Sequence, residues 1–458
     1  MVWFANLSGD NEWSWDSMKQ YYLRTSHLIP PQDGQDVKGK AQPSAHGTGP
    51  LKVTLPGFPF ELDGLVSDVA KSLGQFNLDY NSGDTLGIGW GQFTTGGGER
   101  SSAATAYIKS VIDRANLDVL VNTRAKRLFD SFPNPGSGYI PKMTTVELVS
   151  ENDRNQLMNV TASKEIVLSA GSINTPQTLL LSGIGPKEDL ASLGIPLVAN
   201  SPSVGENLVE HPLVFLAHAV NKETFDDVTR NSTLQMEWLE QWQYDRTGIL
   251  ANPPLSMFGN FKLPSSFPDP SSGPGSGNVM LLFGDGMILP PPSTGNFISV
   301  AAAVLSPTSR GSLKLSSTDP FEHPLIDFNM YSTDFDIKAQ VEGIKMVEEF
   351  LSLPQFKGIV EGPYGDLANA ITDEQKVEFA RANVIPTFHP VGTASMDREN
   401  GVVDSRLKVK GVKGLRIVDA SVFPQIPECN TQAPVYMLAE KASEIIKLDH
   451  AFNIRDEL

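Results

Sequence analysis

The sequence predicts two interleaved sub-domains, one with an α/β fold and one with an α+β fold built on an antiparallel sheet. Strand-like and helical stretches alternate over residues 96–211 and again from 376 to the end, which favours an α/β unit. Between them, in 212–375, short apolar runs mix with helices, which favours an antiparallel sheet with helices on one side. The length of 458 residues is enough for about three domains.

The α/β unit is predicted from short elements with clear boundaries. A helix is expected after Gly171 because an apolar strand ends there and helical spacing follows until Gly183. Pro434 suits the first turn of the last helix, where its missing N–H costs nothing. The expected helices are Ser102–Ala115, Ile173–Leu181 and Ala433–Leu448, and the expected strands are Leu117–Val121, Thr144–Val149, Glu165–Ser169 and Leu415–Val418.

The middle of the chain supplies the predicted antiparallel sheet. Its expected strands are Val279–Phe283, Phe297–Val304 and Ser312–Leu315, and its main helix is Asp334–Phe350. The predicted organisation is a cover region (1–95), a first α/β part (96–211), the α+β sub-domain (212–375) and a second α/β part (376–458).

Composition excludes several classes of function. The chain has 36 basic and 53 acidic residues and a net charge of −17, so a nucleic acid partner is not expected. The single cysteine, Cys429, excludes internal disulfides and Cys-rich metal sites. The seven histidines show no metal-binding spacing, so no metal is expected, and no apolar run is long enough for a membrane span.

The glycine clusters do not predict a nucleotide-binding loop. Gly96–Gly98 has no third glycine spaced to seat a helix, and the alternating glycines of 273–277 follow no strand. Both clusters are interpreted as turns. The G-x-S-x-G pattern of a hydrolase nucleophile is absent.

One histidine has an unusual context. His389 is followed by Pro390 and, two residues later, by the Gly392–Thr393 turn, which would fix the imidazole on a rigid, non-helical segment. A catalytic base needs such rigidity. The alternative is a hydrogen-bonded structural histidine, the ordinary role of a histidine taken without context.

Three segments together resemble the glucose–methanol–choline (GMC) flavoprotein oxidoreductases, and among them fungal members of the aryl-alcohol oxidase type. Weaker matches occur at Trp13–Asp16, at Gly205–His211, where the family more often has Asp in place of Glu210, and at Ser309–Gly311. In order and spacing the matches cover essentially the whole chain. The three main segments are Lys164–Pro186, Thr387–Met396 and Gly414–Val435.

The resemblance implies an FAD-dependent oxidoreductase that acts on the CH–OH group of a small-molecule alcohol, with O₂ or another acceptor, in fungal relatives often in secondary metabolism. A histidine and a second His or Asn face the flavin in this family, and these correspond to His389 and Asn430. A neutral imidazole takes the hydroxyl proton while hydride passes to flavin N5. The amide of Asn430 donates to the developing alkoxide. The position of Asn430, just before the last helix, also suits a helix cap.

The resemblance also implies the cofactor contacts. Asp419 and Ala420 would meet the pyrophosphate and ribityl parts of FAD, and the main chain at Ala125 would meet the adenine. Asn430, Thr431 and Gln432 begin a helix whose positive end lies near the flavin edge in family members. Cys429 is a neighbour of the site but is expected to be a packing residue.

The chain departs from the family pattern at its start. Family members begin with about a hundred or more residues that carry the ADP-binding GxGxxG motif and a second glycine-rich signature, so the FAD-binding fold is expected to be Rossmann-like but incomplete. The chain alone is therefore expected to bind FAD poorly. Two alternatives stay open, namely a non-redox lyase or cyclase on the same scaffold and a homologue without flavin.

The route of the protein in the cell is indicated only weakly. Arg455–Leu458 resembles an ER-retrieval tail, and sequons occur at Asn6, Asn159 and Asn231. No signal peptide is present at the start of this sequence. A signal on a preceding segment would reconcile these observations.

Overall fold

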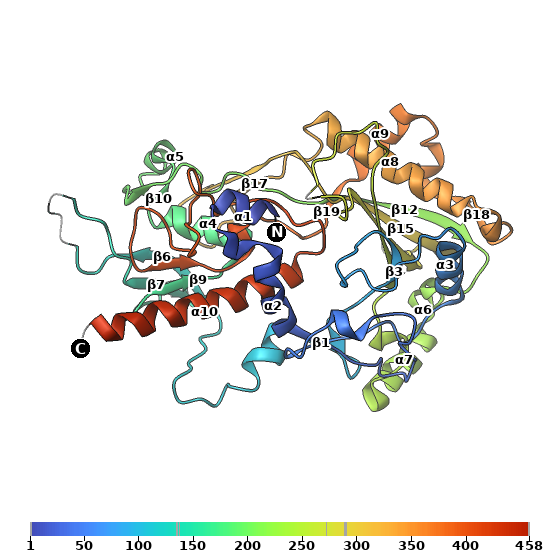
Figure 1. Ribbon diagram of the computed structural model, residues 1–458, viewed down its shortest axis with the longest axis horizontal. Coiled ribbons are helices and arrows are strands. Elements are labelled where there is room, and N and C mark those ends of the chain that lie inside the picture. Colours follow the sequence, from blue (N-terminus) through green and yellow to red (C-terminus); the bar gives the residue numbers. More distant parts are fainter. Residues whose placement is uncertain (1, 134–135, 137, 272, 288–290, 457–458) are drawn as a thin grey trace.

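The computed structural model describes all residues except 1, 134–135, 137, 272, 288–290 and 457–458. Its largest sheet is antiparallel, with the strand order β18-β12-β15-β14-β13-β3 and β19 paired to β12 (Figure 1). These strands are β3 (Gly87–Trp90), β12 (Pro212–Val220), β13 (Leu255–Phe261), β14 (Val279–Asp285), β15 (Asn296–Val304), β18 (Val360–Pro363) and β19 (Ile385–Pro386).

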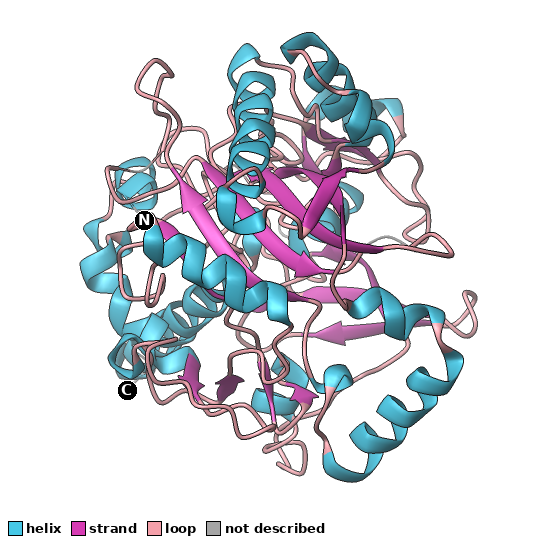
Figure 2. Ribbon diagram, turned by 90° about the vertical axis from the view of Figure 1, so that its right-hand side faces the viewer, coloured by secondary structure: helices cyan, strands magenta, loops and turns pink. Residues whose placement is uncertain are grey.

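Helices cover one face of this sheet (Figure 2). They are α3 (Glu61–Ser72), α8 (Asp334–Leu351) and α9 (Asp373–Asn383). Alternate side chains along β12, such as Val214 and Leu216, join the helix-side core, whereas Leu213 and Phe215 join a smaller cluster on the opposite face. This is the period of two that a strand imposes. Phe283 anchors the core against Phe350 of α8, with ring centroids 5.3 Å apart.

The second part of the molecule contains two smaller sheets. Strands β6 (Thr123–Phe129), β7 (Thr145–Ser150) and β8 (Leu157–Thr161) are antiparallel, and β9 (Ile166–Leu168) pairs in parallel with β20 (Leu415–Ile417). Helix α4 (Gly171–Leu181) follows β9 directly, and α10 (Gln432–Asp456) packs against α2 (Trp15–Thr25), as Figure 1 shows.

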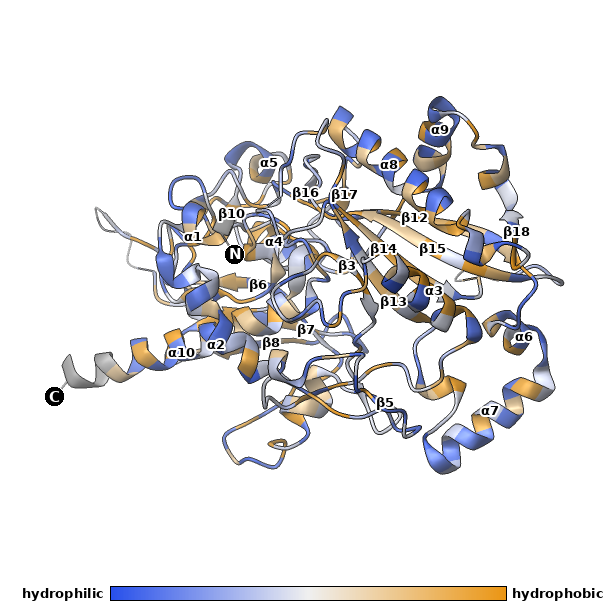
Figure 3. Cartoon of the chain, turned by 45° about the vertical axis from the view of Figure 1, so that its right-hand side comes forward, coloured by the Kyte–Doolittle hydropathy of each residue, from blue (hydrophilic) through white to orange (hydrophobic). Residues whose placement is uncertain are grey.

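Shorter elements connect these layers. Helix α7, which follows β12 through α6, is made mostly of hydrophilic residues (Figure 3). The shorter elements are α1 (Val2–Ser8), β1 (Ser26–Leu28), β2 (Leu51–Val53), β4 (Thr95–Gly96), β5 (Glu99–Arg100), β10 (Ile184–Gly185), α5 (Lys187–Ser192), β11 (Ala199–Asn200), α6 (Phe225–Arg230), α7 (Ser232–Asp245), β16 (Ser312–Lys314) and β17 (Leu325–Asp327).

The structure confirms the antiparallel sheet with helices on one side, the strand–turn–helix at Gly171 and the long last helix. The sheet also takes in β3 from the predicted cover region (1–95) and β19 from the second α/β part (376–458). The prediction that Ser312–Leu315 is a strand of the large sheet was wrong, because β16 pairs only with β17 and lies outside that sheet.

Two other predictions were wrong. The expected helix over Ser102–Ala115 is reduced to a five-residue π-helical turn, Ala104–Ile108. The expected strand over Leu117–Val121 is irregular, and its Val121 is 71% exposed. An apolar run forms a strand only where a neighbour satisfies its backbone, and no described strand lies beside this one.

No helix among the described residues has the length and apolar character needed to cross a membrane. The expected retrieval tail, Arg455–Leu458, ends in residues 457–458, which lie outside the described part of the chain.

Candidate active site

Two distant segments meet at the end of the large sheet where β12 begins. The main chains of Val209 and Val391 exchange two hydrogen bonds, of 3.1 and 3.0 Å. Thr387 donates its peptide N–H and its hydroxyl to the carbonyl of His211, at 3.2 and 2.7 Å. Gly392 permits this approach because its φ is +96° and a Cβ there would lie 2.1 Å from the Asn207 carbonyl oxygen.

The approach brings two imidazoles into contact. Nδ1 of His211 lies 3.0 Å from Nδ1 of His389, and the rings are perpendicular with centroids 5.3 Å apart. Nε2 of His211 lies 3.0 Å from the carbonyl oxygen of Leu305, which follows β15. His211 is fully buried, whereas His389 is partly exposed.

These contacts determine where the ring protons sit. A carbonyl oxygen only accepts, so Nε2 of His211 carries the proton that it donates to Leu305. Nδ1 of the neutral His211 ring is then an acceptor, and Nδ1 of His389 must be the donor. A neutral His389 therefore has a bare Nε2, the nitrogen that takes up a proton.

Burial keeps both rings neutral. Burial lowers the pKa of His389 to about 4, and it lowers the pKa of His211 well below the usual histidine value. The contact between the two rings adds to the effect on His211 because a second positive charge there would be unfavourable. At neutral pH His389 is thus an unprotonated base.

Glu210 lies directly before His211 and is buried. Its carboxylate accepts the peptide N–H of His389 at 3.0 and 2.9 Å and that of His211 at 2.8 Å. Burial raises the pKa of Glu210 to about 7, and these N–H groups limit the increase. One carboxyl group thus contacts the main chain of both histidines.

Asn430 lies at the end of a loop that passes His211. The carbonyl of Pro427 lies near the His211 imidazole, and three residues of chain span at most about 11 Å. The Asn430 side chain is exposed, and the first helical carbonyl of α10 is that of Thr431, which accepts from Val435 N–H at 3.1 Å. Thr431 and not Asn430 therefore occupies the cap position.

Two helix starts offer places for an anionic cofactor such as FAD. Helix α10 begins with the exposed Gln432, and its first N–H groups point out of the helix end. Helix α4 begins beside Ser172, whose hydroxyl is buried and has no hydrogen-bond partner among the described residues. A buried hydroxyl without a partner is costly, so a ligand that supplies one fits this position. The residues present are compatible with FAD.

Asp419 has a structural role beside α4. Its carboxylate accepts from the N–H of Gly171 at 2.9 Å, from the hydroxyl of Thr175 at 2.6 Å and from Ser421 N–H at 2.8 Å. The side chain is thus fully engaged, and the main-chain carbonyls of Asp419 and Ala420 also accept hydrogen bonds, from Val422 and from Gly392 and Phe423. The predicted contact with FAD would therefore be made by the main-chain N–H groups.

The remaining predicted residues lie in β6 and in the loop before α10. Ala125 is in β6 opposite Leu148 and is half-buried, next to a β-bulge. The hydroxyl of Ser182, at the end of α4, accepts the N–H of Leu128 and so ties β6 to α4. Burial raises the pKa of the Cys429 thiol to about 12, so the thiol is protonated at neutral pH and is no nucleophile.

The roles of Glu210 and His211 were not predicted from the sequence. His211 was considered only as a metal ligand and as part of a weak motif match. A usable signal was present, because His211 and His389 both precede a proline. Proline restricts the preceding residue to an extended conformation, so both imidazoles are held on rigid segments.

Comparisons with known proteins agree with this architecture. Two family models, both described as GMC oxidoreductase, match residues 3–213 and 307–439. Dehydrogenase eriK of Hericium erinaceus is 34% identical over 97% of this chain and 77% of the relative. Pyranose dehydrogenase 3 of Leucoagaricus meleagris is 35% identical over 98% of this chain and 76% of the relative.

Solved structures give the same result. A formate oxidase from Aspergillus oryzae, studied for the modification of its FAD, matches with a TM-score of 0.86 and 27% identity, over 98% of this chain and 81% of the neighbour. A fungal aryl-alcohol oxidase matches with a TM-score of 0.83 and 25% identity, over 98% of this chain and 82% of the neighbour. These relatives are oxidases and dehydrogenases, which favours redox chemistry over the lyase or cyclase alternative. The chain therefore belongs to the GMC oxidoreductases and is an FAD-dependent enzyme.

Proposed function

We propose that the chain oxidises a primary alcohol attached to an apolar, flat group, with His389 as the base and Asn430 as the hydrogen-bond donor to the substrate oxygen. The observation that carries the proposal is the hydrogen-bond series from the Leu305 carbonyl through His211 to His389. It leaves Nε2 of His389 unprotonated, and no described residue hydrogen-bonds to that atom.

The chemistry requires both side chains. Hydride leaves an alcohol carbon with difficulty while the oxygen keeps its proton, so a base at the hydroxyl accelerates the step by about 10²–10⁴. Nε2 of His389 takes that proton while Nδ1 keeps its bond to His211. The amide of Asn430 does not titrate, and it stabilises negative charge on the oxygen. Bound FAD supplies the acceptor for the hydride.

The face of the sheet that carries His211 favours an apolar substrate. His211 shares the parity of Leu213 and Phe215, so its ring lies on the face away from α8. The neighbouring strands present Met280 and Leu282 on that face, and Phe258 packs against it. A sugar needs many hydrogen-bonding side chains, whereas the side chains of this cluster are apolar. An aromatic or extended apolar alcohol suits it.

The cofactor part of the proposal concerns the parallel strands. β9 and β20 form a parallel pair, and parallel sheets are normally buried on both faces. Val167 in β9 is nevertheless 42% exposed. These two strands belong to a larger, Rossmann-like FAD-binding sheet, to which α4 and α10 direct their N-terminal ends. The boundaries 96–211 and 376–458 for its two parts remain part of the proposal.

A reduction experiment with the flavin-loaded enzyme tests the function. Under anaerobic conditions 4-methoxybenzyl alcohol should bleach the yellow flavin absorption much faster than D-glucose does. His389→Ala should slow this bleaching by about 10²–10⁴ while flavin stays bound. His218→Gln is the matched control, because His218 lies in β12, the strand that follows His211. It alternates in step with Val214 and Leu216, so its buried side chain lies on the opposite, helix-covered face.

The outcomes separate the two parts of the proposal. An unchanged bleaching rate in His389→Ala would exclude His389 as the base. Faster bleaching by D-glucose would exclude the apolar substrate class and leave the role of His389 intact.

A further inference from the structure

One buried ionisable group next to the site has no part in the proposed proton transfer. Glu210 is only 4% exposed, although a buried carboxyl group is costly unless it is well bonded. The hydrogen bonds to its carboxylate come from peptide N–H groups, and among the described residues no Lys or Arg pairs with it. An apolar side chain at this buried position would stabilise the fold at least as well, so stability alone does not explain a carboxyl group here.

The geometry connects this carboxylate to the base. Both oxygens accept the N–H of His389, at 3.0 and 2.9 Å, and one of them also accepts the N–H of His211 at 2.8 Å. The two imidazoles that form the hydrogen-bond series are therefore held by one group at their main chains. The Nδ1–Nδ1 distance of 3.0 Å depends on both main-chain positions.

The segment that Glu210 holds is strained. Phe388, directly before His389, has a φ of +62°, which is unfavourable for a bulky side chain. The Phe388 ring is 82% exposed, so its own packing does not hold the backbone in this conformation. Hydrogen bonds of its two neighbours hold it: Thr387 donates to the His211 carbonyl, and the N–H of His389 donates to Glu210.

We propose that Glu210 is the positioning residue of the active site, whose carboxylate fixes the backbone of His389 so that its imidazole stays bonded to His211 with Nε2 directed at the substrate. The proposal rests on the proposed function, in which His389 is the base. Glu210 acts through His389 and does not touch the alcohol. A displacement of a catalytic group by about 1 Å costs about 10²-fold in rate.

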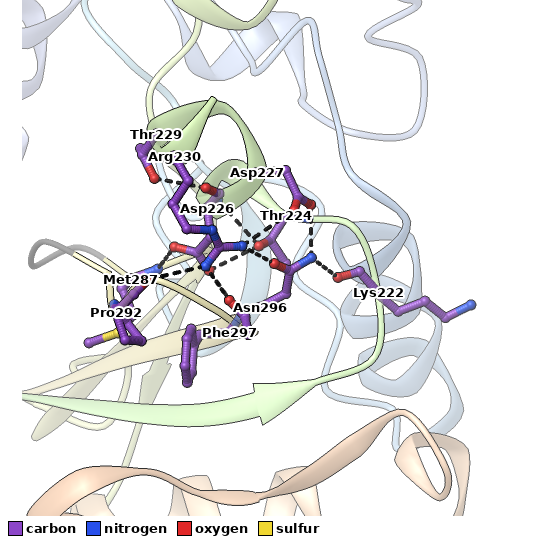
Figure 4. A network of polar contacts seen from close by, with 11 residues as sticks. Lys222, Thr224, Asp226, Asp227, Thr229, Arg230, Met287, Pro292, Asn296 and Phe297 are labelled. Atoms are coloured by element: carbon purple, nitrogen blue, oxygen red, sulfur yellow. Dashed lines mark hydrogen bonds and ion pairs between the residues drawn. The ribbon is translucent and has the colours of Figure 1, made fainter. Parts of the chain in front are cut away.

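A second buried carboxylate provides the matched control. Asp226 in α6 is fully buried and accepts the N–H of Met287 at 2.8 Å and of Phe297 at 2.9 Å, in the network of Figure 4. It also holds main-chain N–H groups, but at the opposite end of β15 from Leu305 and its contact with His211. Asp226→Asn therefore reproduces the loss of a buried carboxylate without disturbing the histidines.

The test compares variants of the flavin-loaded enzyme with an aryl alcohol. Glu210→Gln places an amide N–H₂ among N–H donors and should lower kcat about 10²-fold with KM nearly unchanged. Glu210→Asp keeps both acceptor oxygens on a shorter stem and should lower kcat by about tenfold. Asp226→Asn should keep the wild-type kcat. Wild-type kcat in both Glu210 variants would overturn the proposal.

A measurement without turnover completes the test. In protein with ¹⁵N-labelled histidine, the His389 ring should show one neutral tautomer in the wild type and in Asp226→Asn, and a mixture in Glu210→Gln. If Glu210→Gln does not fold, Glu210→Asp tests the proposal by the same signal and by kcat. A single tautomer together with wild-type kcat in Glu210→Asp would contradict the proposal. If His389→Ala is fully active, it is the proposed function that fails, whatever the Glu210 variants do.

Discussion

The large antiparallel sheet and the parallel pair β9–β20 differ in how well the described chain covers them. Every residue of β14 is buried, and so is β15 after its first residue. In β9 the middle residue, Val167, is 42% exposed, and all five residues of β8 nearby are exposed. Both regions have a core, because Ile166 and Leu168 belong to a second buried apolar cluster and all of β20 is buried. The parallel region differs in that Val167 and the residues of β8 are open to solvent.

This difference separates the two halves of the candidate site, the histidines with Glu210 and the helix starts that are expected to bind the cofactor. His211, His389 and Glu210 all attach to the antiparallel region or to segments bonded to it, and hydrogen bonds to one another and to Leu305 hold them in place. The helix starts of α4 and α10 attach to the parallel region, and the buried hydroxyl of Ser172 in α4 lacks a partner among the described residues, as do three buried polar atoms of the antiparallel sheet. We infer that the proposed acid–base residues are preorganised, and we expect the helix starts to gain contacts when FAD binds.

Core substitutions give the largest expected contrast between the two regions. Phe283→Ala removes a buried ring that packs against Phe350 and should lower the free energy of unfolding by about 3–5 kcal/mol. Val167→Ala in the parallel pair should lower it by less than about 0.5 kcal/mol in the chain without flavin. Urea denaturation measures both. Equal losses would mean that β9 is as well buried as β14, contrary to the comparison.

A buried carboxyl pair in the antiparallel region should give a smaller effect. Asp63 of α3 accepts from the Ser256 hydroxyl and lies against Asp285, whose Oδ2 has no partner among the described residues. Burial raises the pKa of Asp63 to about 6, and burial together with the Asp63 charge raises the pKa of Asp285 well above its usual value.

Because of this pair, the free energy of unfolding should fall as the pH rises. A carboxyl group whose pKa is raised on folding stabilises the fold below its unfolded pKa of about 4 and loses that contribution as pH rises through the folded value. The free energy of unfolding of the wild type should therefore fall by about 1 kcal/mol or more between pH 5 and 8. Asp285→Asn should reduce this fall, as chemical denaturation at both pH values would show. The same pH dependence in both proteins would exclude this pair as its source.

The sequence was informative where local chemistry decides the structure. The strand–turn–helix at Gly171, the helix after Pro434 and the strands of 279–304 were predicted because apolar periodicity and glycine or proline boundaries coincide there. Leu117–Val121 was predicted wrongly because an apolar run does not reveal whether a neighbouring strand exists. The membership of β3 in the large sheet depends on a pairing with β13, far away in sequence.

The candidate site was predictable only in part. His389 was identified by its rigid context and by the family resemblance, and Asn430 by the resemblance alone. The contact between His211 and His389 joins residues 178 positions apart. No local pattern encodes such a contact. The role of Glu210 follows from hydrogen bonds to backbone N–H groups, which every residue except proline carries and which therefore leave no trace in the sequence.

The protonation state of the His389 ring is decisive for the proposed mechanism, because the base must present a bare Nε2 to the substrate. Nitrogen-15 NMR of histidine-labelled protein at pH 7, with His389→Ala to assign the signal, distinguishes the two ring nitrogens. We expect a neutral ring with its proton on Nδ1, and protonation only as the pH falls toward about 4. A proton on Nε2 of His389 at neutral pH would refute the mechanism.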